Sequence, residues 1–291
     1  MFIDVHGHAF RDPYPGKQGE PVFSTPQQLM VRYDELNIEK AALLPIVNPE
    51  VYLPQSNEEI LAICAEWPER FFPFCNIDPR AYTNSSDAPL TQLLEHYKKR
   101  GCKGLGEVMP NLPILHPLVR NLFRCAEKAD LPLTVDMSTF MDRGYGLYDD
   151  PGLPQLEYSL RIFPKLRIIG HGPPFWAEIG ELETPGDRAG YPSYPFTKEG
   201  VVPKLFRRYS NLYADLSAGS GYNALARNLS YAPIFLEEFQ DRLMYGTDIC
   251  GHTQPVPIGD LLIQLRDEGK ISSTVFEKVA RLNAKKLFDL S

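Results

Sequence analysis

Short apolar runs alternate with longer amphipathic stretches from one end of the chain to the other. Eight of the apolar runs have the length and bounding residues of buried strands. These runs are residues 2–6, 40–45, 71–76, 103–108, 132–137, 166–170, 211–216 and 242–246. Because a helical pattern separates each strand from the next, the strands are expected to form a parallel sheet.

Helical periodicity is clearest in two of the intervening stretches. The apolar residues of 116–129 fall on one face of a helix, and those of 272–289 do the same. Eight repeats of a strand followed by a helix predict a closed (β/α)8 TIM barrel, an α/β fold that often fills one domain of this length. No low-complexity linker divides the chain, so we expect a single domain over residues 1–291.

Two predicted connections are unusually long. They cover residues 138–153 and 172–196, and the second is rich in glycine, proline and aromatic residues. Connections of this length in a compact domain are usually functional, and aromatic content argues against disorder. We therefore expect both to form walls of a substrate site, with Trp176 as a contact.

Three arginines in predicted loops could bind a substrate carboxylate through a guanidinium fork. They are Arg11, Arg143 and Arg188. Arg143 is the preferred candidate for substrate binding, although a solvated loop residue is an equally simple interpretation of each.

Charge and cysteine usage narrow the partners and the compartment. The chain has 30 basic and 37 acidic residues, a net charge of −7, and no cluster of basic residues beyond short pairs. This balance argues against nucleic acid as a partner. No apolar run approaches the ~20 residues of a membrane span. The expected partner is a small-molecule substrate, and a homo-oligomer remains an open alternative.

Five cysteines without a Cys-x-x-Cys pair indicate a reducing compartment. The chain also opens directly into a strand instead of a basic and apolar leader. We therefore expect a cytoplasmic protein.

Two histidines one residue apart close the first predicted strand. Side chains alternate along a strand, so His6 and His8 point to the same side and could reach one ion. Gly7 between them removes steric bulk. A lone His-x-His motif is weak evidence, and two exposed histidines at a strand end would give the same pattern.

Other polar residues end the remaining strands, and in a barrel these ends meet at one face. They are Glu107, Asp136, His171 and Asp248. Each has a simpler explanation: a solvated strand end, a turn or helix cap, or a core histidine. Apolar flanks nevertheless favour inward carboxylates at Glu107 and Asp136. His96 and His116 are expected to be ordinary surface residues, and His252 is left undecided.

Taken together, these segments resemble the amidohydrolase superfamily, in the branch of metal-dependent hydrolases related to aminocarboxymuconate semialdehyde decarboxylase. The resemblance spans the whole chain. It depends on four segments: Ile3-Asp4-Val5-His6-Gly7-His8, Gly170-His171-Gly172, Tyr245-Gly246-Thr247-Asp248 and Asn283-Ala284-Lys285-Lys286-Leu287-Phe288.

The resemblance implies a role for each matching residue. His6, His8 and Asp248 would bind a divalent metal, and Asp248 would also take a proton from water. His171 would bind the metal or polarise the substrate, and Glu107 would bind one ion or bridge two. Asp136 is the departure, because that strand usually ends in a histidine ligand; an aspartate there would either supply oxygen or leave the site one ligand short.

The predicted cofactor is therefore a divalent metal, with zinc preferred, manganese or iron as alternatives, and one or two ions. The leading hypothesis is hydrolysis of a small ester, lactone or amide by metal-activated water, with Asp248 and His171 as catalytic residues. The same branch also implies non-oxidative decarboxylation or hydration of a carboxylated substrate as the alternative. A third interpretation is a ligand-binding barrel whose metal site has degenerated at Asp136.

Overall fold

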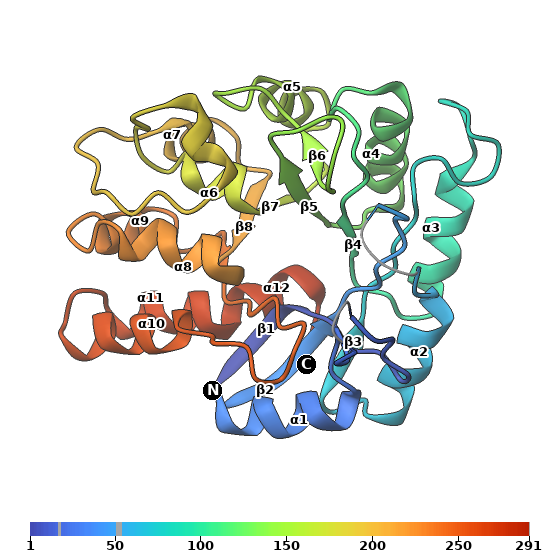
Figure 1. The fold of residues 1–291 in the computed structure, drawn as a ribbon, viewed down its shortest axis with the longest axis horizontal. Coiled ribbons are helices and arrows are strands. Elements are labelled where there is room, and N and C mark those ends of the chain that lie inside the picture. Colours follow the sequence, from blue (N-terminus) through green and yellow to red (C-terminus); the bar gives the residue numbers. More distant parts are fainter. Residues whose placement is uncertain (17–18, 51–53, 291) are drawn as a thin grey trace.

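Eight parallel strands form the wall of a barrel in the computed structural model, which describes residues 1–16, 19–50 and 54–290. In the chain order of Figure 1 these strands are β1 (Phe2–Gly7), β2 (Ile38–Leu43), β3 (Phe71–Pro73), β4 (Leu105–Val108), β5 (Leu133–Ser138), β7 (Ile168–His171), β8 (Leu212–Asp215) and β9 (Leu243–Met244). All eight strands predicted from the sequence are confirmed, several of them shortened by a few residues at their ends.

The strands belong to two sheets that meet at two seams. One sheet has the order β1-β2-β3, and the other runs β4-β5-β7-β8-β9. A parallel bridge between Cys75 and Leu105 joins the first sheet to the second. At the other seam, the Val5 N–H donates to the Tyr245 carbonyl at 3.1 Å. These two seams close the (β/α)8 barrel that the sequence predicts.

Helices surround the strands, as Figure 1 shows. They are α1 (Pro26–Glu35), α2 (Asn57–Glu66), α3 (Leu90–Lys99), α4 (Pro117–Ala129), α5 (Pro154–Ile162), α6 (Pro173–Ala177), α7 (Val201–Arg208), α8 (Ala218–Ala226), α9 (Ala232–Glu238), α10 (Ile258–Asp267), α11 (Ser273–Glu277) and α12 (Asn283–Phe288). Helix α4 confirms the predicted helix over 116–129. The predicted helix over 272–289 consists of α11, the π-helical η2 (Lys278–Leu282) and α12. No helix in the described part of the chain is long and apolar enough to cross a membrane.

Helix α4 begins and ends where its sequence predicts. The side chain of His116 accepts a hydrogen bond from the Leu118 N–H, and Pro117 takes the first helical position, which needs no N–H donor. Asp130 ends the helix in the left-handed conformation. His116 is half-buried and caps this helix, a role that was not predicted for it.

The barrel interior is filled by side chains on or next to five strands and by the C-terminal helix. The cluster contains Ile3, Val5, Ala42, Leu44, Phe72, Phe74, Ile169, Met244, Ala284 and Phe288. Phe288 of α12 contacts Phe72 and Phe74, with ring centroids 5.8 and 5.2 Å apart. This packing leaves the carboxyl ends of the strands as the open side of the barrel.

Both long connections contain regular structure. Strand β6 (Leu147–Tyr148) lies within 138–153 and pairs with β5, and α6 and the 3-10 helix η1 (Pro185–Ala189) lie within 172–196. Pro173 and Pro174 of α6 line the pocket at the barrel mouth, whereas Trp176 is buried in the core. Helical rotation explains this division, because residues two or three positions apart point in different directions.

Candidate active site

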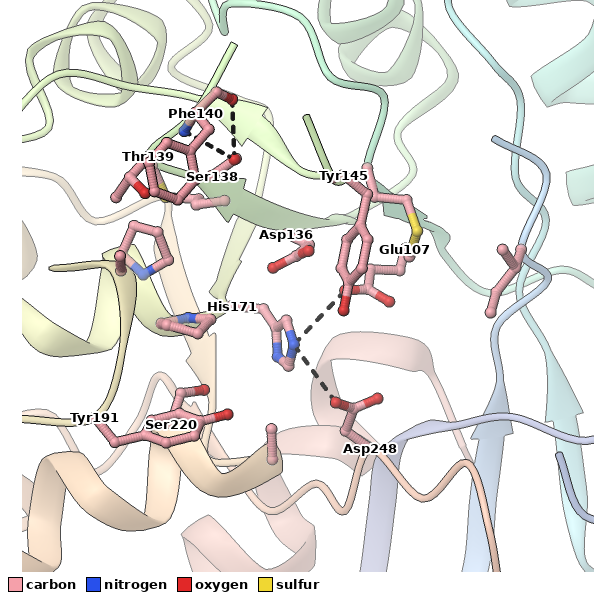
Figure 2. A pocket seen from close by; sticks show the side chains of 18 of the residues that line it. Glu107, Asp136, Ser138, Thr139, Phe140, Tyr145, His171, Tyr191, Ser220 and Asp248 are labelled. Atoms are coloured by element: carbon pink, nitrogen blue, oxygen red, sulfur yellow. Dashed lines mark hydrogen bonds and ion pairs between the residues drawn. The ribbon is translucent and has the colours of Figure 1, made fainter. Parts of the chain in front are cut away.

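The polar residues predicted at the strand ends meet in one pocket of about 500 Å³ at the carboxyl ends of the strands. Five of them line it directly: His8, Glu107, Asp136, His171 and Asp248. Figure 2 shows the carboxylates of Glu107, Asp136 and Asp248 gathered around the ring of His171. His6 lies beneath these groups and is fully buried. The barrel thus brings together all six predicted metal-site residues.

A local irregularity in β1 turns His6 toward the pocket. The register between β1 and β2 shifts between Asp4 and Gly7. The Tyr33 hydroxyl donates a 2.7 Å hydrogen bond to the Asp4 carboxylate. A Cβ atom at position 7 would collide with the same hydroxyl. Asp4 and the open side of Gly7 therefore face Tyr33, whereas His6 faces the carboxylates. The expectation that Gly7 removes steric bulk is correct, and Tyr33 is the group that requires it.

Four of these residues have the spacing of ligands around one ion. The Nε2 atom of His6 lies 3.3 Å from Glu107 Oε2 and 3.7 Å from Asp248 Oδ1. The Nε2 atom of His8 lies 3.7 and 3.4 Å from the same two oxygens. Two ligand atoms each about 2.1 Å from a zinc ion in tetrahedral geometry are themselves about 3.4 Å apart. The donor set of His6, His8, Glu107 and Asp248 therefore fits a divalent metal.

The remaining carboxylate oxygens face His171. Its Nε2 atom lies 3.6 Å from Glu107 Oε1 and 3.9 Å from Asp248 Oδ2. Asp136 forms a second cluster with Glu107 and His171, in which the ligand atoms lie within 4.8 Å of one another. Glu107 thus presents one oxygen to each cluster, as a bridging ligand between two ions would.

Asp215, at the end of β8, contacts the Nδ1 atoms of two of the imidazoles. Its Oδ2 lies 2.9 Å from His6 Nδ1, and its Oδ1 lies 2.9 Å from His171 Nδ1. Sequence analysis did not single out Asp215, although it ends the predicted strand 211–216 as the other candidates end theirs. The hydroxyl of Ser217 donates to the same carboxylate at 2.6 Å.

The Nδ1 atoms of the three site histidines each lie within hydrogen-bond distance of a protein oxygen. The His8 Nδ1 atom lies 2.9 Å from the Leu44 carbonyl oxygen, and Asp215 takes the other two. When Nδ1 carries the proton, Nε2 is left with a lone pair that faces the carboxylates. A histidine held in this way is oriented and made more basic as a metal ligand.

Burial and neighbouring charge shift the pKa values of the site in opposite directions. Burial opposes charge on His171, but the carboxylate of Asp215 outweighs it and raises the pKa of His171 to about 9. Burial opposes charge on His6 as well, and Glu107 and Asp215 raise its pKa well above the usual value. The two histidines in turn hold the pKa of Asp215 far below its usual range, in spite of its burial.

Asp136 and Asp248, two of the carboxyl groups that line the pocket, have pKa values shifted in opposite directions. Burial and the charge of Glu107 raise the pKa of Asp136 well above its usual value. The pKa of Asp248 is lowered in spite of burial, by a hydrogen bond from His8 and by the charges of His6 and His171. Asp248 is therefore ionised at neutral pH and Asp136 is the carboxyl group that most readily keeps its proton.

Asp4 links β1 to the segment that carries Asp248. It accepts a 2.9 Å hydrogen bond from the Thr247 N–H and a 2.6 Å bond from the Thr247 hydroxyl. Burial raises its pKa to about 6, although these bonds favour the charged form. Asp248 itself has a positive φ of 53°, and its N–H donates to the His6 carbonyl at 2.8 Å. The position of Asp248 is thus fixed against β1.

The predicted substrate contacts are placed differently. Arg143 lines the pocket, with its guanidinium 3.9 Å from the ring centre of Phe140. Trp176 does not contact the pocket, because its indole N–H donates to the Asp215 carbonyl in the core at 3.0 Å. Arg11 forms an ion pair with Glu66, and Arg188 is buried in a pair with Glu178. His252 is exposed and contacts Ser24 at 3.3 Å.

The sequence matches the profile of the amidohydrolase family over residues 3–290. The chain belongs to the amidohydrolase family. The resemblance drawn from the four sequence segments is thereby confirmed. Among proteins with curated functions, none matches the chain.

Solved structures with the same fold are distant in sequence. An amidohydrolase from Burkholderia multivorans superposes with a TM-score of 0.64 at 14% identity, covering 100% of each chain. A 2,6-dihydroxybenzoate decarboxylase from Rhizobium gives 0.59 at 18%, covering 99% of this chain and 98% of that one. A probable 2-pyrone-4,6-dicarboxylic acid hydrolase from Acinetobacter baumannii gives 0.59 at 15%, covering 99% of both. These similarities establish the fold of this family member.

Proposed function

We propose that this amidohydrolase is a metal-dependent hydrolase of a small ester, lactone or amide. The observation that carries the proposal is the placement of His6, His8, Glu107 and Asp248 around one point at the base of an open pocket. Zinc is the preferred ion, because two imidazoles and two carboxylates suit it, although manganese and iron accept the same donors. Asp136 and His171 extend the donor set far enough for a second ion.

The chemistry divides among the residues as follows. A bound divalent ion would act as a Lewis acid, polarising a carbonyl oxygen and making water acidic enough to attack at neutral pH. Asp248 is ionised and its side chain is 24% exposed to the pocket, so it can accept the proton of the attacking water and pass it to the leaving group. The Nε2 atom of His171 faces the same space and can donate a hydrogen bond to the developing oxyanion.

Non-oxidative decarboxylation is the second candidate, and Arg143 favours it. This side chain is exposed at the pocket, and no carboxylate of the described residues pairs with it. A guanidinium that is held against the Phe140 ring, with no carboxylate partner among the described residues, could bind a substrate carboxylate. Decarboxylases among the structures of this fold are consistent with that chemistry.

The first experiment is metal analysis by mass spectrometry on protein purified without chelator or added metal. We expect one or two ions per chain, and loss of most of the metal in His6→Ala. An empty wild-type protein that gains no thermal stability from added zinc or manganese would contradict the metal site. That result would favour a metal-free lactonase or a ligand-binding barrel.

A second experiment separates the two reactions. The metal-loaded protein is incubated with panels of lactones, amides and carboxylated aromatic compounds, and products are identified by mass spectrometry. Hydrolysis of a lactone gives an acid with the mass of one added water, and hydrolysis of an amide gives an acid and an amine whose masses together equal substrate plus water. Decarboxylation instead releases carbon dioxide. Asp248→Asn is the matched control, because a true product must diminish in this variant.

A further inference from the structure

Ser220 presents a buried hydroxyl to the pocket without a hydrogen-bond partner. The residue is only 2% exposed and lines the pocket from the first turn of α8. Its Oγ atom has no hydrogen-bond partner among the described residues. A buried hydroxyl that lacks a partner destabilises the folded protein, so its presence at the wall of a ligand pocket calls for a ligand.

Tyr191 brings a second hydroxyl to the same turn of α8. A Cβ on Gly219 would lie 3.3 Å from Tyr191 Cζ and 3.5 Å from its hydroxyl oxygen, so the phenol rests against this turn. No hydrogen bond of that hydroxyl is found within the described part of the chain. Figure 2 shows Tyr191 and Ser220 on the opposite side of His171 from Glu107.

The helix end itself adds donors and positive potential. Ser217 is the N-cap residue of α8 but makes no capping bond, because its hydroxyl donates to Asp215. The Ala218 N–H donates to the Thr247 carbonyl at 3.2 Å, whereas the N–H groups of Gly219 and Ser220 have no acceptor among the described residues. Such an N-terminus favours a negatively charged group.

We propose that the Ser220 hydroxyl, the Tyr191 phenol and the first turn of α8 form a subsite for a carboxylate of the substrate. Two hydroxyl donors and a helix N-terminus match the two oxygens of one carboxylate. The subsite lies across His171 from Glu107, so it would hold an end of the molecule that points away from that carboxylate. This assignment extends the proposed hydrolase by naming its substrates as small acids that carry a second, cleavable group.

Benzoate is a suitable probe, because it joins a carboxylate to a ring that the Phe140 and Tyr145 side of the pocket can accept. Binding is measured by isothermal titration to the protein as purified and again after chelator treatment. We expect Ser220→Ala and Tyr191→Phe each to weaken benzoate binding about tenfold. The control Ser230→Ala removes an exposed hydroxyl outside the pocket and is expected to bind like wild type.

Thermal unfolding without ligand distinguishes a binding role from a structural one. Because the Ser220 hydroxyl has no partner to lose, Ser220→Ala is expected to melt at or above the wild-type temperature. Three results would overturn the subsite. The first is unchanged benzoate affinity in both pocket variants, and the second is a lower melting temperature together with unchanged affinity. The third is a wild-type protein that binds no benzoate. Equal binding of benzyl alcohol would overturn its assignment to an anion.

The chelator-treated arm separates this proposal from the proposed function. Benzoate binding that depends on Ser220 in metal-free protein supports the subsite even if no hydrolysis is ever found. Conversely, the protein could prove to be an active metal-dependent hydrolase in which Ser220→Ala leaves benzoate affinity unchanged. The proposed function would then stand and the subsite would be rejected.

Discussion

The carboxylate of Asp215 holds the ring of His171 through a 2.9 Å contact to Nδ1, although 44 residues separate the two in the chain. The other oxygen of the same carboxylate holds His6 at an equal distance. One buried aspartate thus orients two imidazoles toward the pocket, and its charge stabilises a proton on either ring. This coupling gives several expectations for experiment.

Replacing Asp215 with asparagine should weaken metal binding while the fold is kept. The asparagine amide has nearly the same shape as the aspartate carboxylate but no charge. Its N–H can donate to the histidine Nδ1 and so favour the tautomer that carries its proton on Nε2, the nitrogen that would bind the metal. Loss of such an outer partner typically costs about 10- to 100-fold in metal affinity. The measurement is a competition titration against a chromogenic chelator. Wild-type affinity in Asp215→Asn would show that the contact does not support a metal site.

Asp248→Asn should lower turnover by about 10²- to 10⁴-fold, the usual contribution of a general base. The variant also removes one charged ligand, so metal content must be measured beside activity. The matched comparison is Asp149→Asn, a buried aspartate that bonds backbone N–H groups away from the pocket. Full activity in Asp248→Asn would exclude it as the base.

Metal affinity should rise with pH. A histidine must lose its Nε2 proton to bind an ion, and the metal-free protein holds that proton tightly, with the pKa of His171 at about 9. For each proton that the metal displaces, the apparent metal affinity therefore rises about tenfold with each unit increase in pH, as long as the pH is below the raised pKa. Chelator competition at pH 6, 7 and 8 measures this slope. Constant affinity over that range would mean that neither His6 nor His171 carries a displaced proton.

Asp136→Asn should stabilise the metal-free protein at neutral and higher pH. The folded-state pKa of Asp136 is raised, so ionising it costs free energy in the folded protein but not in the unfolded chain. The cost is absent below the ordinary pKa near 3.8 and grows as pH rises toward the raised value. Each unit of difference is worth about 1.4 kcal/mol. Urea unfolding of chelator-treated protein at pH 4.5 and 8 should therefore show a gain for the variant that widens with pH, and a gain that stays constant would place the cause elsewhere.

The alternation of strand and helix patterns was enough to predict the barrel. It also predicted which face would carry chemistry, because parallel strands that close on themselves bring all their carboxyl ends to one side. His6, His8, Glu107, Asp136, His171 and Asp248 could be found in this way, each as the polar residue that ends an apolar run. Asp215 ends β8 by the same rule and could have been found by applying it to every strand.

Other features had no signal along the chain. The burial of Trp176 depends on the direction in which α6 leaves β7, and the exposure of Arg143 depends on how the loop after β5 folds back. The unpaired hydroxyl of Ser220 becomes visible only when every neighbour is in place, since any serine in a sequence could have a partner.

The sequence by itself determined the order of the elements, the family and the set of groups at the barrel mouth, because these follow from local periodicity and from residue type at strand ends. Only the tertiary structure decided the contacts and the protonation state of each of those groups. Which carboxylate oxygen faces which imidazole, which acid keeps its proton and which hydroxyl lacks a partner all depend on distances of a few ångströms between residues far apart in the chain. Electrostatic and hydrogen-bond energies change steeply over such distances, and sequence spacing does not specify them.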